Sequence, residues 1–276
     1  MRGIARDGLR ARVCGPWTRE KLRYLEKYAT AFTRAMRQKW RELVYIDLLA
    51  GPGLGIDRRT RAEFDGSPLI ALKIRPAFDR LIFSDVDSAN TSALKRRIPS
   101  ADRPRVVIET GDCHDIAARV VAQLPGHALA LAFVDPEGFE VTFRMFETLA
   151  QKKVDVLYLF PGGIGVARNI GNFVKQAKAP LDDLIPGWRE LRRARLAAGE
   201  KLTHDEMAAR DQPFVLAFLD RMRTLGFQFS DHGEPYFTNE KNVKMYHLLF
   251  FSQHAAGLTI WRKVTRIEAS GQRRLF

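Results

Sequence analysis

The sequence predicts a doubly wound α/β sheet, and three observations support this. Short apolar runs recur along the first 160 residues, amphipathic segments of helical length separate them, and the runs are apolar at nearly every position. Alternation of this kind is typical of parallel βαβ units whose strands are buried on both faces. The expected strands are 43–48, 81–85, 105–109, 129–135 and 154–160, and the expected helices between them are 67–75, 88–98, 114–124 and 142–151.

The regions flanking this alternation predict four further features. Residues 1–15 are expected to form a basic N-terminal arm, and apolar residues at helical spacing predict a helix over 17–40. Residues 161–240, which begin with the glycine-rich stretch PGGIG, interrupt the alternation and predict a helical insertion. The runs 244–253 and 258–264 predict a closing antiparallel hairpin. We therefore expect residues 16–276 to form a single domain.

Composition favours a polyanionic partner. The chain has 276 residues, 45 Lys and Arg against 32 Asp and Glu, and a formal net charge of +13. Such a surplus is typical of nucleic-acid binding, although arginines spread over a solvated surface give the same count. The basic clusters are Arg58, Arg59 and Arg61; Arg192, Arg193 and Arg195; and Arg273 and Arg274.

Cysteine usage and hydropathy indicate the compartment. The two cysteines, Cys14 and Cys113, provide neither a disulfide framework nor zinc-ligand spacing. The basic N-terminus lacks the apolar core of a signal peptide, and no apolar run is long enough to cross a bilayer. These features predict a cytoplasmic protein with no membrane partner.

The stretch ELVYIDLLAGPGLG (42–55) predicts a ligand site. It ends an apolar strand on Asp47 and places Gly51 and Gly53 in the following turn, where ligands of open α/β sheets bind. Glycines there admit positive φ and close approach of the backbone to a ligand. A dinucleotide would require G-x-G-x-x-G opening a helix, and a P-loop would require Gly-Lys-Ser/Thr. Neither is present. An acid before the glycines suits the sulfonium and ammonium of S-adenosylmethionine (SAM).

Three further strands also end on acids. Asp85 follows the second and can accept the ribose hydroxyls, Asp112 follows the third and can bond the adenine amine, and Asp135 follows the fourth. Each has a structural alternative, because Asp after a strand commonly caps a helix or forms a turn. Asp115 competes with Asp112 for the adenine role, and Asp87 is the expected cap of the helix at 88.

These motifs resemble those of class I SAM-dependent methyltransferases, and more narrowly of the three-Cys-motif partner protein family. The resemblance covers roughly residues 14–266. It rests on the stretches WTREKLRYLEKY (17–28), YIDLLAGPG (45–53), GSPLIAL (66–72), FSDVD (83–87), GDCHD (111–115), FVDPEG (133–138) and LLFFSQHAAG (248–257). It implies a Rossmann-like methyltransferase sheet that binds SAM and works beside a partner protein carrying three cysteines. The family's substrate is poorly defined.

The predicted reaction is methyl transfer to a base amine of DNA or RNA. Asp135 and the carbonyl of Pro136 are the expected catalytic groups, and Phe139, Phe160 and Arg168 are the expected substrate contacts. Both phenylalanines are more plainly explained as core residues. The stretch Asp-Pro-Glu-Gly-Phe departs from the Asp-Pro-Pro-aromatic pattern of amino-methyltransferases and is closer to the Asp-Pro-Phe-Gly turn of some tRNA guanine methyltransferases. No metal site is predicted, because no histidines have ligand spacing. The alternatives are a non-catalytic module binding nucleic acid or a partner, and a nuclease-type defence effector.

Overall fold

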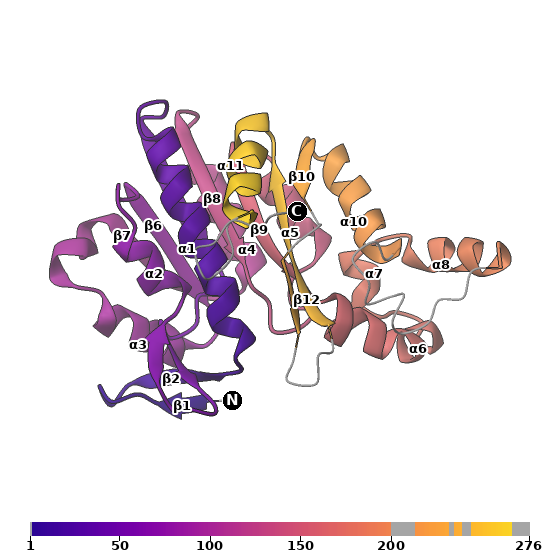
Figure 1. The fold of residues 1–276 in the computed structure, drawn as a ribbon, viewed down its shortest axis with the longest axis horizontal. Helices are drawn as coiled ribbons and strands as arrows, with labels where there is room; N and C mark the ends of the chain where they lie inside the picture. The colour runs from indigo at the N-terminus through magenta and orange to yellow at the C-terminus, as the bar shows by residue number, and fades with distance from the viewer. Residues whose placement is uncertain (1, 200–212, 232–234, 239–243, 267–276) are drawn as a thin grey trace.

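The computed structural model describes residues 2–199, 213–231, 235–238 and 244–266 (Figure 1). Its main sheet has eight strands, in the order β10-β12-β9-β8-β3-β6-β7, with β11 paired to β12. These strands are β3 (Glu42–Asp47), β6 (Arg80–Asp85), β7 (Val106–Thr110), β8 (Ala128–Val134), β9 (Val154–Phe160), β10 (Phe229–Asp231), β11 (Tyr236–Thr238) and β12 (Lys244–Ser252).

The main sheet confirms the predicted doubly wound architecture. The chain runs outward from β3 through β6 to β7, then returns to β8 on the other side of β3, and these strands are parallel. Strand order therefore reverses between β3 and β8, which is where open α/β sheets bind ligands. The antiparallel strand β12 lies between β9 and β10.

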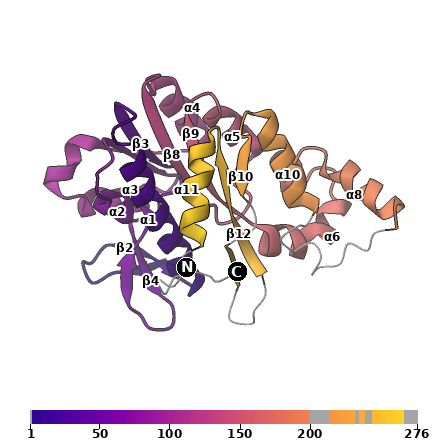
Figure 2. The ribbon, with the colours of Figure 1, turned by 45° about the horizontal axis from the view of Figure 1, so that its top comes forward.

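Helices cover both faces of this sheet (Figures 1 and 2). One core cluster includes α1 (Trp17–Met36), α2 (Ser67–Lys73), α3 (Ser88–Arg97) and α11 (Ala255–Thr265). The other includes α4 (Cys113–Gln123), α5 (Phe143–Leu149), η2 (Gly162–Ala167), α6 (Arg168–Lys175), α7 (Pro180–Leu184), α8 (Trp188–Ala197) and α10 (Pro213–Thr224). A 3₁₀ helix, η1 (Ser100–Arg105), precedes β7.

The apolar runs of β3, β6, β8, β9 and β12 are continuous because each of these strands contributes to both clusters. Along β3, Leu43 and Tyr45 pack in the first cluster, whereas Val44 and Ile46 pack in the second. Successive side chains on a strand point to opposite faces, so a strand covered on both sides needs an apolar residue at each position.

The first 15 residues do not form the loose arm that we expected. They contain β1 (Arg2–Ile4) and β2 (Arg10–Cys14), which join β4 (Leu54–Asp57) and β5 (Glu63–Asp65) in a separate four-stranded sheet, here called the small sheet. Strand β2 pairs with β1 and, in parallel, with β4. Ala5, Ala11 and Ile56 form its own small core. Local composition could not reveal this pairing, because the partner strand lies about forty residues further along the chain.

The predicted closing hairpin is also incorrect in its second half. Residues 244–252 form β12 as expected, but 258–264 lie within helix α11. His254 caps this helix by accepting the Ala256 N–H at Nδ1. The buried residues Gly257, Trp261 and Val264 recur at helical spacing, which decides for a helix over a strand.

The other expected boundaries mostly agree with the structure. The predicted helix over 17–40 ends at Met36. In its described residues, the predicted insertion contains helices from η2 to α8 and then α10, after which the chain enters β10 and β11. In the part of the chain that the structure describes, no helix combines the length and apolarity needed to cross a bilayer.

Gly257 allows α11 to pack closely on the sheet. A Cβ there would lie 2.5 Å from the Ser252 Oγ and 2.9 Å from the Asp155 Oδ2. Asp155 is buried and accepts a 2.6 Å hydrogen bond from the Tyr28 hydroxyl, so this region cannot shift freely. We expect Gly257→Ala to lower the free energy of unfolding by about 1–3 kcal/mol, as overpacking does. Urea denaturation would measure this, with Gly126→Ala, which has open space around it, as the control.

Candidate functional site

The point of strand reversal brings two acids together. Asp47 ends β3 and pairs in register with Phe133 of the neighbouring strand β8, and Asp135 directly follows the end of β8. The Asp47 side chain is fully buried, and its Oδ1 accepts the Leu49 N–H at 3.3 Å. Its Oδ2 has no hydrogen-bond partner among the residues that the structure describes. Burial raises the pKa of Asp47 to about 7, opposed by a hydrogen bond from Ser67 and reinforced by the charge of Asp135.

The glycine turn after β3 holds Asp85. The Gly51 N–H donates to the Asp85 Oδ2 at 3.0 Å, and the Asp87 N–H donates to its Oδ1 at 2.8 Å. Gly51 and Gly53 have φ values of +64° and +89°, which confirms the positive φ expected from the sequence. Each Asp85 oxygen keeps a second lone pair for a ligand hydroxyl.

A cavity of about 540 Å³ opens over these groups. This volume lies within the ~300–1,000 Å³ of pockets that enclose small organic ligands. The side chain of Val86, 76 % exposed, offers an apolar surface beside the carboxylate of Asp85. Residues lining this ligand cavity are Arg10, Ala11, Arg12, Leu49, Gly51, Pro52, Asp85, Val86, Asp87, Asn90, Asp135, Glu137 and Glu140.

A second, smaller cavity of about 190 Å³ adjoins the first. The two share Arg12, Asp135 and Glu137. The smaller cavity, here called the acceptor cavity, has aromatic side chains in its wall and cations around it. Its lining residues are Arg12, Val13, Cys14, Gly15, Trp17, Thr18, Lys21, Arg58, Asp135, Pro136, Glu137, Leu159 and Tyr246. A group bound here would meet the ligand of the larger cavity at Asp135.

Asp135 is held by a buried ion pair. The Lys21 Nζ on α1 donates to both carboxylate oxygens, at 2.6 Å and 2.5 Å. The side chains are only 6 % and 11 % exposed. The Arg12 guanidinium also lies in the field of Asp135 and Glu137, and these charges raise the pKa of Arg12 against the opposing effect of burial. Asp135 therefore has a fixed orientation at the junction of the cavities.

Strand β2 forms one wall of the ligand cavity, to which it contributes Arg10, Ala11 and Arg12. Arg10 makes a 2.8 Å ion pair with Asp87, and Arg12 makes a 2.9 Å ion pair with Glu137. Arg97 on α3 connects this strand to the glycine turn, because its Nη1 donates to the carbonyl oxygens of Arg10 and Pro52. The small sheet thus completes a site that the main sheet begins.

Several predicted site residues line neither cavity. Asp47 and Gly53 belong to the strand and turn that carry the ligand cavity rather than to its wall. Asp112 is exposed and caps α4 by accepting the N–H groups of His114 and Asp115, which matches its structural alternative. Arg168 is exposed at the start of α6. The expected adenine contact of Asp112 and substrate contact of Arg168 are therefore not supported by their positions.

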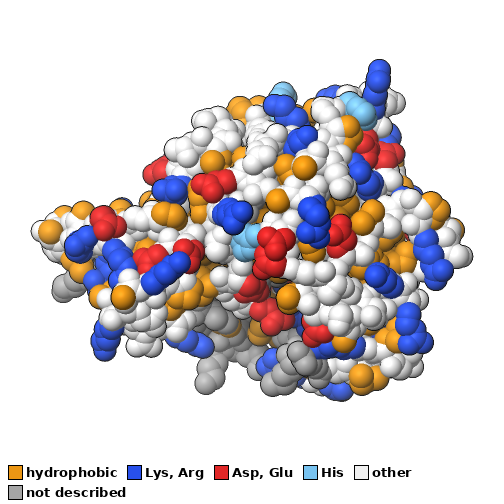
Figure 3. Space-filling view, turned by 180° about the vertical axis from the view of Figure 1, so that it is seen from behind, with side chains coloured by type: hydrophobic (Ala, Val, Ile, Leu, Met, Phe, Trp, Pro, Cys, Tyr) orange, Lys and Arg blue, Asp and Glu red, His pale blue; other side chains and the backbone are white. Residues whose placement is uncertain are grey.

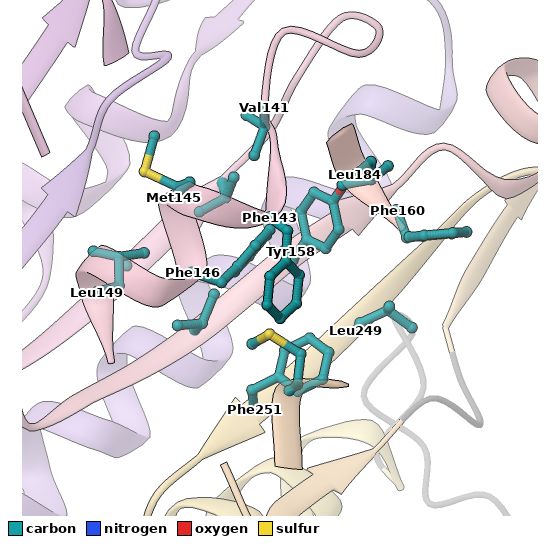
Figure 4. Packing of buried hydrophobic residues seen from close by; sticks show 14 of the residues in the cluster. Val141, Phe143, Met145, Phe146, Leu149, Tyr158, Phe160, Leu184, Leu249 and Phe251 are labelled. Atoms are coloured by element: carbon teal, nitrogen blue, oxygen red, sulfur yellow. The ribbon is translucent and has the colours of Figure 1, made fainter. Parts of the chain in front are cut away.

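The two phenylalanines pack against the core, as their structural alternative predicts. Phe160 is fully buried beside Tyr158 and Phe218 (Figure 4). Phe139 is half-buried and packs edge-on against Phe173, with 5.4 Å between the ring centroids. We therefore correct the expectation that Phe160 contacts substrate, because its ring is enclosed by other aromatic side chains and lines neither cavity.

Sequence reasoning missed several lining residues. Asp87 caps α3 as expected, accepting the Ala89 N–H at 3.0 Å, but it also lines the ligand cavity. Arg10 and Arg12 lie in the segment expected to be an arm, and Lys21 lies within a helix whose pattern indicated only an apolar face. The sequence carried no local signal for Lys21, because its partner Asp135 lies 114 residues further along the chain.

One group of residues has the composition of a metal site. In the described part of the chain, ligand atoms of Asp112, Cys113 and His114 lie within 4.8 Å of one another. His114 Nε2 accepts the Thr142 N–H at 3.2 Å, which directs the Nδ1 proton toward Asp112. Burial raises the pKa of Cys113 to about 12. Asp112 caps α4.

Comparisons with known proteins show similarity only at the level of three-dimensional structure. No family model matches the sequence, and no curated protein matches it. A solved Legionella pneumophila protein aligns over 88 % of this chain and 91 % of its own, with 11 % identity and a TM-score of 0.48. Trm1 from Pyrococcus horikoshii, solved with SAM, aligns over 90 % and 58 %, with 11 % identity and a TM-score of 0.43. The O-methyltransferase TomG from Streptomyces achromogenes, also with SAM, aligns over 83 % and 80 %, with 15 % identity and a TM-score of 0.41. Similarities this low do not assign a function.

Proposed function

We propose that this protein is a SAM-dependent methyltransferase that acts on a base amine of nucleic acid. The observation that carries the proposal is the meeting of two cavities at Asp135, at the point of strand reversal. A methyl transfer requires donor and acceptor to be held against one another in line, because the barrier is lowered chiefly by alignment. Two adjoining cavities that meet at Asp135 supply that arrangement.

The ligand cavity fits SAM by its donor set. Asp85 would accept the ribose hydroxyls with its free lone pairs, and the Val86 side chain would pack against the flat adenine ring. The buried Asp47, whose Oδ2 has no partner among the described residues, lies behind the glycine turn and would ionise beside the positive methionine end, because a nearby cation favours the charged carboxylate. When bound, SAM supplies a methyl group already activated by the sulfonium.

The chain's own residues act on the acceptor. Asp135 would accept a hydrogen bond from the amine, and the Pro136 carbonyl would accept a second, so that the nitrogen lone pair points toward the ligand cavity. Lys21 holds the Asp135 carboxylate in one orientation. Trp17 and Tyr246 offer aromatic surface for stacking a flat base. A cavity of about 190 Å³ is too small for a whole drug-sized ligand and suits a single ring system.

Titration of SAM into the purified protein by calorimetry tests the cofactor. We expect binding by the wild type and at least about tenfold weaker binding by Asp85→Ala, equivalent to ~1.4 kcal/mol. Asp220→Ala, which removes an exposed acid on α10, is the matched control and should bind normally. The absence of binding by a folded wild type would overturn the cofactor assignment.

A labelled-methyl assay then tests the reaction. We expect transfer to nucleic acid by the wild type, and Asp135→Asn to lower turnover by about 10²–10⁴-fold while SAM still binds. The non-catalytic alternative has one observation in its favour, because Lys21 already occupies both oxygens of Asp135. SAM binding without transfer, with and without a partner protein, would favour that alternative. A partner carrying three cysteines remains part of the proposal.

A further inference from the structure

We infer that the tip of the β4–β5 hairpin, residues 58–61, binds the phosphate backbone of a single-stranded nucleic acid whose base enters the acceptor cavity. This inference rests on the proposed function and adds the surface that holds the substrate. The tip connects β4 to β5 in the small sheet and carries Arg58, Arg59 and Arg61. All three side chains are exposed.

The hairpin is tied to the acceptor cavity by position. Arg58 lines that cavity together with Asp135 and Lys21, and its N–H donates to the Cys14 carbonyl oxygen at 2.9 Å. A base held at Asp135 would therefore place its own backbone beside Arg58, with the rest of the tip extending outward.

The tip is also fixed in shape. The Asp57 Oδ1 accepts the N–H groups of Arg59 and Thr60 at 2.9 Å and 2.8 Å, and these hydrogen bonds lower the pKa of Asp57. The Asp57 carboxylate is thus engaged in the turn. Because the backbone of the tip is already ordered, binding a ligand there costs little conformational entropy.

The charge of the tip is not neutralised within the described chain. No acidic side chain there lies in ion-pair contact with Arg58, Arg59 or Arg61. The neighbouring acids of the small sheet are occupied elsewhere, since Asp7 pairs with Arg97 and Asp65 pairs with Lys73. Unpaired arginines grouped beside a cavity are suited to phosphate, which guanidinium groups bind through parallel hydrogen bonds.

The helical insertion, which carries the basic cluster Arg192, Arg193 and Arg195, is less suitable. Arg189 is bonded to Asp182, and Arg193 to Glu190. Helix α8 lies at the opposite end of the molecule from the small sheet in both ribbon views (Figures 1 and 2). On the face seen in Figure 3, basic side chains are spread among acidic ones rather than gathered.

Salt-dependent binding of a labelled single-stranded RNA oligonucleotide, followed by fluorescence anisotropy, tests the inference. Each phosphate contact to a single strand contributes about 0.7 to the slope of log K against log salt. We expect Arg58→Ala/Arg59→Ala to reduce the slope by about 1.4, which corresponds to roughly 25-fold weaker binding at ~0.1 M salt. Arg58→Lys/Arg59→Lys should retain most of the slope. A single-stranded DNA of the same sequence is titrated alongside.

The matched control is Lys39→Ala/Lys153→Ala. It also removes two exposed positive charges, but these precede β3 and β9 at the other end of the strands. Its slope should equal that of the wild type. The inference is overturned if the hairpin and control variants have the same slope, or if the wild type binds neither RNA nor DNA, in which case an acidic protein is the better partner. The ligand cavity does not include residues 58–61, so the hairpin variant should still bind SAM. Titration of SAM into this variant therefore separates the two proposals.

Discussion

Lys21→Met is expected to lower the free energy of unfolding by about 3–5 kcal/mol. The substitution leaves the Asp135 carboxylate 11 % exposed and without its ammonium partner. Removing one member of a buried ion pair is costly because the remaining charge stays desolvated. The nearby charge of Arg12 partly compensates for the loss of the ammonium, so we expect a value at the lower end of this range. Even about 3 kcal/mol is a large share of the ~5–15 kcal/mol that stabilises an ordinary domain.

Chemical denaturation of Lys21→Met and of the double variant Lys21→Met/Asp135→Leu measures this. The double variant should recover most of the loss, because an apolar pair of similar volume replaces both charges. Lys73→Met is the control, because Lys73 pairs with Asp65 but is 70 % exposed. Its removal should lower the free energy of unfolding by less than about 1 kcal/mol. A Lys21→Met protein as stable as the wild type would contradict the buried pair.

The ligand-free protein is expected to lose stability as the pH rises from about 4 to about 7. Burial raises the pKa of Asp47 to about 7 and the pKa of Asp155 to about 6, from an ordinary value of 3.8. A folded state that holds a proton more tightly than the unfolded state is stabilised below the unfolded pKa. That stabilisation disappears as the pH rises through the folded pKa. At ~1.36 kcal/mol per pKa unit, Asp47 alone would account for about 4 kcal/mol.

Denaturation midpoints between pH 4 and pH 8 would show this slope, and Asp47→Asn should flatten most of it. Asp155→Asn should flatten a smaller part, at lower pH. A cation beside Asp47 favours its ionised form, so SAM should stabilise the wild type more at pH 8 than at pH 5.5. Asp47→Asn should lose that difference. Equal stabilisation at both values in the wild type would show that Asp47 does not face the ligand's positive charge.

The sequence by itself determined the parallel strands of the main sheet and the acids that follow them. Strands buried on both faces require uninterrupted apolar runs, so 43–48 and 154–160 could be predicted directly. Parallel strands end at one edge of a sheet, so the strand ends alone place Asp47, Asp85 and Asp135 together. The glycines of the turn were predictable because positive φ excludes most other residues at Gly51 and Gly53.

Only the tertiary structure decided what closes the site. Strand β2 is stable because it pairs with β4, and the pairing of segments so far apart leaves no local pattern. Lys21 and Asp135, 114 residues apart in the chain, meet because α1 packs on the sheet beside β8 and β9. The same packing made α11 a helix, since its buried face lies against both α1 and the sheet strand β12. Local sequence specifies which side chains can serve a site, but the long-range contacts that give each charge its partner arise only from the folded chain.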